Sequence, residues 1–141
     1  MAVLLAGSVM PVFAQEDGRG PGMIAHRCAL RIAAITHRTV HAIQHETQPC
    51  VLLITYLKNA GHEEMAAHVA ENCVRRVNMI AAHGVEAIGA VTQRCVNVLQ
   101  EHGAPEEVIQ GLQQQAETAV MTIQEAKERA IHLIQEALNG E

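Results

Sequence analysis

The sequence predicts an all-α protein, an antiparallel bundle of three long helices in a domain that covers residues 23–141. Hydrophobic residues make up 49% of the 141-residue chain but aromatic residues only 1%. The core must therefore be built from small and aliphatic side chains, which suit closely packed helices. Apolar residues recur at steps of three and four along much of the chain, as they do on one face of a helix. Four cysteines are spaced so that they can link two antiparallel helices.

The N-terminal residues 1–14 have features of a secretory signal peptide. They form an uncharged apolar run that ends in Val12-Phe13-Ala14, so we expect cleavage after Ala14 and a periplasmic or secreted product. This run is shorter than the roughly 20 residues of a membrane-spanning helix, and no transmembrane segment is expected after cleavage. Residues 15–22 hold three glycines and a proline, a composition typical of a flexible tether.

Two turn signals divide the rest of the chain. These are Asn59-Ala60-Gly61 and His102-Gly103-Ala104-Pro105, and each is followed by two glutamates. Acidic residues suit the first turn of a helix because they complement its dipole. We therefore expect three helices, at about 23–59, 62–101 and 105–139.

The first of these helices contains Pro49. Proline removes a backbone hydrogen-bond donor and disfavours helix at the residue before it. The sequence therefore predicts a kink or a break in the first helix at residues 47–49.

The third helix has the clearest apolar seam. Its positions alternate steps of three and four, which is the heptad pattern of a coiled coil, and many of them are small, so a neighbouring helix can come close. The seam consists of Ile109, Leu112, Ala116, Ala119, Ile123, Ala126, Ala130, Leu133 and Ala137. A second apolar stripe consists of Val120, Ile131, Ile134 and Leu138. It widens the expected buried face, so that the third helix can pack on a pair of helices.

The cysteines recur with a period of 45 residues, because Cys28 and Cys50 are followed by Cys73 and Cys95. This indicates an old tandem duplication. A repeat of that length also suits an α-solenoid, but with fewer than three full copies we favour a bundle.

The cysteine positions predict two disulfides. If the first two helices form a hairpin about the turn near Gly61, the numbers of facing residues sum to 123. Cys50 then faces Cys73, and Cys28 faces Cys95. Such bonds stabilise a domain by about 2–4 kcal/mol each in an oxidising compartment. The alternative is that the pairs stay reduced and hold a soft metal ion such as Cu(I).

The same register leaves Glu46 opposite Val77 on an otherwise apolar seam. We expect an ion pair with Arg76 at the edge of the interface. The alternative is a buried functional carboxylate.

The chain is rich in histidine, with nine residues, and His37, His41 and His45 recur every four positions. Two imidazoles at i and i+4 on a helix can share one metal ion. The hairpin register brings Glu86 level with His37 and places His83 nearby. A candidate site for Cu, Zn or Ni therefore consists of His37, His41, His83 and Glu86. The alternative is a solvated polar face with no cofactor and a pH-sensitive charge.

No phosphate-binding loop, nucleophile elbow or zincin motif occurs in the sequence, so we expect no enzyme. The net charge of −5 and the lack of stacking aromatic residues argue against nucleic acid. The arginines of the first two helices are instead expected to pair with glutamates of the third. We expect an exported structural or protein-binding module whose partner is another protein or a second copy in a homodimer. The alternative is a periplasmic metal-binding or metal-sensing protein that uses surface histidines or reduced cysteine pairs.

Overall fold

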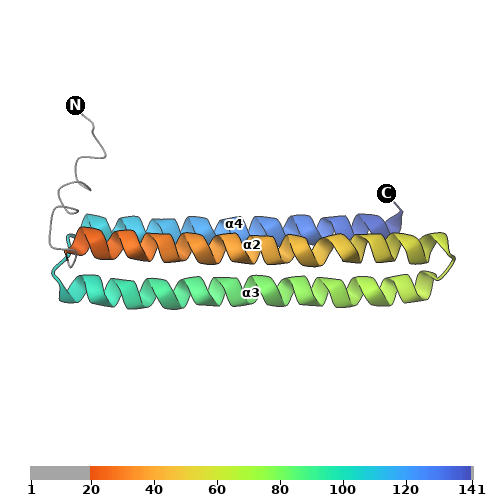
Figure 1. Cartoon of the computed structure of the whole chain (residues 1–141), viewed down its shortest axis with the longest axis horizontal. Coiled ribbons are helices and arrows are strands. Elements are labelled where there is room, and N and C mark those ends of the chain that lie inside the picture. Colours follow the sequence, from red (N-terminus) through yellow and green to blue (C-terminus); the bar gives the residue numbers. More distant parts are fainter. Residues whose placement is uncertain (1–19, 141) are drawn as a thin grey trace, which may run out of the picture.

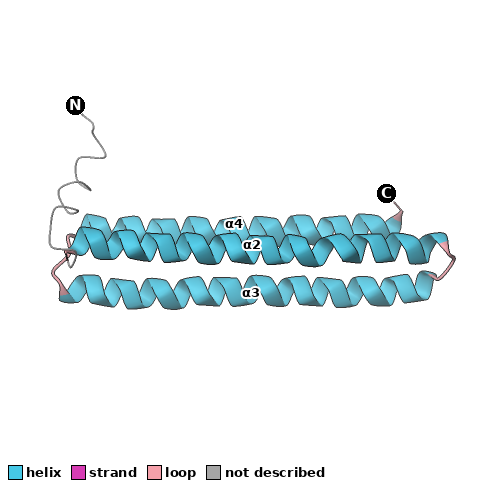
Figure 2. Ribbon diagram, in the orientation of Figure 1, coloured by secondary structure: helices cyan, strands magenta, loops and turns pink. Residues whose placement is uncertain are grey.

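The computed structural model describes residues 20–140, which form three helices: α2 (Pro21–Asn59), α3 (Glu63–Glu101) and α4 (Glu106–Asn139). The helices lie side by side in a long rod, and α3 runs antiparallel to α2 and α4 (Figure 1). The described part of the chain contains only helices and short loops (Figure 2). The predicted all-α bundle of three helices is therefore confirmed. The expected signal peptide and residues 15–19 of the expected tether lie outside the described residues.

The helix boundaries agree with the predicted ones to within two residues. α2 begins at Pro21, two residues earlier than expected, because the fixed φ of proline suits the first position of a helix. The two turns contain Gly61 and Gly103, with φ values of 83° and 68°. This left-handed conformation carries little steric cost for glycine, and it lets the chain reverse in a few residues. None of the three helices is long and apolar enough to cross a membrane.

The predicted break in the first helix is wrong, because α2 continues through Pro49 to Asn59. Pro49 is exposed, and so is His45, the residue whose carbonyl would otherwise accept a hydrogen bond from position 49. The missing bond therefore lies on the solvent side of the helix, where water can replace it. On the opposite side, the buried Cys50 joins this turn to α3 through a disulfide. Tertiary contacts thus hold the turn in helical geometry despite the proline.

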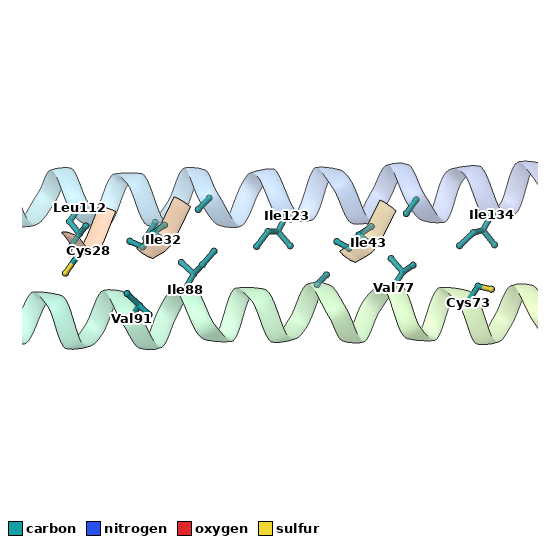
Figure 3. Packing of buried hydrophobic residues seen from close by; sticks show 14 of the residues in the cluster. Cys28, Ile32, Ile43, Cys73, Val77, Ile88, Val91, Leu112, Ile123 and Ile134 are labelled. Atoms are coloured by element: carbon teal, nitrogen blue, oxygen red, sulfur yellow. The ribbon is translucent and has the colours of Figure 1, made fainter. Parts of the chain in front are cut away.

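The core is a column of aliphatic side chains between the three helices. Ile123 and Ile134 of α4 point towards α3, where Val77 and Ile88 point back at them (Figure 3). All four are completely buried. The fully buried side chains of α2 are Ile32 and Ile54, with Ile43 almost as deep. The rest of the core combines aliphatic side chains such as Leu99 and Leu112 with many alanines, and the alanines allow the helices to approach closely.

The buried stripes rotate slightly along the helices. Leu133 was expected on the seam of α4 but is 42% exposed, and the fully buried position is its successor Ile134. Likewise, the hairpin register, in which facing residue numbers sum to 123, places Leu53 of α2 opposite Ala70. Leu53 is nevertheless 45% exposed, while Ile54 is buried. A straight helix has 3.6 residues per turn, so a heptad pattern drifts by about 20° per repeat around it. Leu133 has therefore turned out of the core towards the surface.

Candidate functional site

Both predicted disulfides are present. Cys28 is bonded to Cys95 and Cys50 to Cys73, and the Cα atoms are 6.3 Å apart in each pair. No cysteine is free within the described chain. The bonds join α2 to α3 near both ends of the hairpin, so the sequence register about the turn is confirmed.

An ion pair lies beside the Cys50–Cys73 bond. Arg76 Nε donates a hydrogen bond to Glu46 Oε2, which confirms the predicted partner of Glu46. Arg76 Nη2 lies 3.6 Å from Cys73 Sγ and 3.9 Å from Cys50 Sγ. The carboxylate oxygen Glu46 Oε2 is 3.8 Å from Cys50 Sγ. The Glu46 side chain is 27% exposed and that of Arg76 is 53% exposed, so the pair contributes little to stability, about 0–1 kcal/mol.

The three histidines at four-residue spacing form a row on the surface of α2. The rings of His37 and His41 stack with centroids 6.4 Å apart, and those of His41 and His45 with centroids 5.9 Å apart. All three residues are exposed. Their ring nitrogens are therefore open to solvent and to ions.

The four predicted metal ligands are all exposed on the surfaces of α2 and α3: His37, His41, His83 and Glu86. No three of them bring their ligand atoms within 4.8 Å of one another. The group within residues 20–140 that meets this criterion is Glu46, Cys50 and Cys73. Because its two sulfurs are joined in a disulfide, this group offers no thiolate in the oxidised protein. The four-residue site stays a prediction.

A groove of about 700 Å³ runs between α2 and α4. Its apolar lining is Val40, Ile43, Val51, Leu52, Ala126, Ala130 and Leu133. Its charged and titratable lining is His41, His45, Glu125 and Arg129. Leu52 is 71% exposed, so the groove presents large aliphatic side chains to solvent.

The expected pairing between the arginines of the hairpin and the glutamates of α4 does not form. Within the described chain, the charged pairs are Glu46 with Arg76, His68 with Glu71, and His132 with Glu136. The apolar stripe of α4 faces the other two helices. Its glutamates therefore project outward, as the exposed Glu117, Glu125 and Glu128 show.

Sequence reasoning missed two features of this surface. It did not place Leu52 and Leu133 in a common groove. The drift of a heptad pattern around a straight helix was the available signal that Leu133 turns towards the surface. It also did not bring Arg76 to the sulfur atoms. The three-residue step from Cys73 to Arg76, close to one helical turn, was the available signal for that contact.

No family model, curated protein or solved structure matches this chain. Its function must therefore be inferred from its own side chains.

Proposed function

We propose that this protein is an exported, non-catalytic protein-binding module that receives an apolar helix in the groove between α2 and α4. The observation that carries the proposal is the pair Leu52 and Leu133, two large side chains that flank one groove and are 71% and 42% exposed. Exposed apolar side chains that gather in a groove are typical of interaction sites. An amphipathic helix is the element that such a groove between two helices accommodates.

The groove has features that would orient a partner helix. Glu125 and Arg129 lie one turn apart on α4, and His41 and His45 lie one turn apart on α2. The apolar lining would contribute most of the affinity, whereas the charged groups would select the partner and its direction. A partner with an aliphatic stripe between residues of both charges fits this surface.

Export is supported by the two intramolecular disulfides. Such bonds persist in oxidising compartments and are rare in the cytosol. The apolar N-terminal run supports the same location. We therefore propose that the module acts in a periplasm or outside the cell.

A site-specific crosslink tests the groove. A photo-crosslinking amino acid would replace Leu52 in cells that produce the full chain, with Leu30 as the matched control. Leu30 is 57% exposed on the same helix but does not line the groove. We expect a discrete crosslinked product from position 52 only. Equal products from both positions, or none from position 52, would contradict the proposal.

The partner could be a second copy of the chain, and sedimentation velocity distinguishes this case. If a homodimer uses the groove, Leu133→Glu should return it to the monomer. Met121→Glu is the control, because Met121 is 61% exposed on α4 and does not line the groove. A monomer at all concentrations, together with a crosslink from position 52, would identify a different protein as the partner.

The stacked histidine row favours a second candidate function, the binding of Cu, Zn or Ni. His41 belongs to both i,i+4 pairs of the row, with His37 and with His45. Each pair can offer two imidazole nitrogens to one ion, and solvent or a second molecule would complete its coordination. This function needs no change in the disulfides.

Titration calorimetry of the oxidised protein with Zn²⁺, Ni²⁺ and Cu²⁺ tests this candidate. We expect a Kd tighter than about 1 mM that His41→Asn weakens and His26→Asn leaves unchanged. The variant His83→Asn tests whether α3 contributes a metal ligand, which the four-residue site requires. The absence of binding to all three ions would contradict the metal function.

A further inference from the structure

The two disulfides have different charged surroundings. The guanidinium of Arg76 is within 3.9 Å of both sulfurs of the Cys50–Cys73 bond and closest to Cys73 Sγ. For the Cys28–Cys95 bond, the described residues place no such hydrogen-bond donor on a sulfur. Exposure does not separate the two bonds, since all four cysteines are at most 6% exposed. The surroundings of the two bonds therefore differ in charge and not in exposure.

The internal duplication explains this difference. A shift of 45 residues relates Cys28 to Cys73, and the same shift relates Arg31 to Arg76. Each arginine thus follows its cysteine by three positions. The residue that corresponds to Glu46 is Val91. Arg31 consequently lacks the carboxylate that holds the Arg76 side chain across the sulfurs.

We propose that the Cys50–Cys73 bond is a thiol-exchange site that reacts with small thiols, while the Cys28–Cys95 bond is structural. A cation beside a sulfur stabilises the thiolate form of that sulfur. The sulfur that becomes a stable thiolate is the better leaving group in disulfide exchange. Arg76 Nη2 is nearest to Cys73 Sγ, and the Glu46 carboxylate, 3.8 Å from Cys50 Sγ, disfavours a thiolate on Cys50. Cys73 is therefore the leaving group and Cys50 is the sulfur that is attacked.

The exchange consists of two balanced displacements. In the first, an external thiolate attacks Cys50 Sγ, a new sulfur–sulfur bond forms, and the electron pair of the old bond leaves on Cys73 Sγ beside Arg76. In the second, another external thiolate attacks the external sulfur of the mixed disulfide and expels the Cys50 thiolate. The external thiol is thereby oxidised to its disulfide, and the protein bond is reduced by two electrons.

The Arg76 and Glu46 side chains flank this bond, with polar atoms within 3.9 Å of its sulfurs. The Arg76 side chain is 53% exposed and the Glu46 side chain 27% exposed. The proposed exchange requires these long side chains to rotate away from the sulfurs. Ile54 and Ile134 are fully buried, and the Cys28–Cys95 disulfide remains. The hairpin therefore stays folded when the Cys50–Cys73 bond is open.

Graded reduction with 2-mercaptoethanol, a thiol with no charged group other than its reacting thiolate, tests the site. Aliquots are alkylated, and peptide mass measures the opening of each bond. We expect the Cys50–Cys73 bond to open first, and Arg76→Gln to slow its opening about threefold. That value follows from a Brønsted coefficient of about 0.5 and a roughly tenfold effect of the cation on thiolate stability.

Two variants show whether the charge is responsible. Arg76→Lys keeps a cation and should retain most of the opening rate of the Cys50–Cys73 bond. Arg31→Gln, at the duplicated counterpart, should change the opening rate of neither bond. The proposal is overturned if both bonds open at the same rate or if Arg76→Gln has no effect. The position of the trapped mixed disulfide is a separate check, because it should be found on Cys50. A mixed disulfide on Cys73 would overturn the assigned direction of attack.

Discussion

Thr39 and Gly84 face each other midway between the two disulfides of the α2–α3 hairpin. A Cβ atom added to Gly84 would lie 2.5 Å from both Oγ1 and Cγ2 of Thr39. Each of the two residues is eleven positions from both cysteines of its own helix. The close contact at the centre allows the helices to stay near enough for the Cα separation of 6.3 Å at both bonds.

Gly84→Ala should therefore destabilise the protein. The new methyl group must push against Thr39, and overpacking of this kind costs about 1–3 kcal/mol. Guanidinium unfolding followed by circular dichroism measures the change. The matched control is Gly89→Ala on the same helix, where an added Cβ has no neighbour within 4 Å. That change should stabilise the protein by about 0.5–1 kcal/mol, because alanine favours helix. Equal effects at both positions would show that the contact with Thr39 is unimportant.

The loss in Gly84→Ala should be partly recovered by Thr39→Ala in the same chain. The two closest atoms to the added methyl, Oγ1 and Cγ2 of Thr39, are then absent. A double-mutant cycle measures the coupling between the positions. Strictly additive effects would place the strain of the alanine variant elsewhere.

Removal of the Cys28–Cys95 disulfide should lower the free energy of unfolding more than removal of the Cys50–Cys73 disulfide. The Cys28–Cys95 bond spans 67 residues and the Cys50–Cys73 bond 23. A bond that closes a longer loop removes more entropy from the unfolded chain, which gives about 4 kcal/mol and about 3 kcal/mol respectively. Paired Cys→Ala variants compared under non-reducing conditions provide the measurement. The reverse order would mean that native contacts, rather than loop length, decide the contribution of each bond.

Pro49→Ala should stabilise the protein by about 1–3 kcal/mol. The new amide can donate to the carbonyl of His45, and the steric cost of proline in a helix interior disappears. Thermal unfolding measures the gain, with the exposed neighbour Gln48→Ala as the control. An unchanged or lower melting temperature would indicate that Pro49 makes a favourable contribution of its own.

Ile123→Ala should loosen α4 from the hairpin. Ile123 is completely buried against the other helices, and truncation of such a side chain costs about 2–5 kcal/mol. Met121→Ala, at a position that is 61% exposed on the same helix, should have little effect. Hydrogen exchange of α4 in both variants shows where protection is lost. Protection that falls only in α2 and α3 would contradict the role of Ile123 in docking α4.

Local sequence rules predicted the helices because capping, turn and dipole preferences act within a few residues. Gly61 and Gly103 lie at the turns as expected. The disulfide pairing also followed, because a tight turn fixes the register of an antiparallel hairpin along its whole length. Glu46 was assigned its partner Arg76 by the same register.

The predictions failed where the outcome depends on three helices at once. The seam of α4 follows a heptad only approximately, so the position of the third helix decides that Ile134 is buried and Leu133 lines a groove. The metal-ligand hypothesis combines side chains from two helices that are all exposed, and it stays a prediction. The spacing of residues along one helix predicts where their side chains point only to within the angular drift of that pattern around the helix.

The sequence by itself determined the all-helical class, the length of each helix and the two cysteine pairs, because these follow from hydrogen bonding, turn chemistry and register along the chain. Only the tertiary structure decided that α2 remains continuous at Pro49, because the stabilising contacts come from another helix. It also decided which apolar side chains remain exposed between α2 and α4 and which sulfurs Arg76 approaches. Those relationships depend on the packing angles of whole helices, which no local pattern specifies.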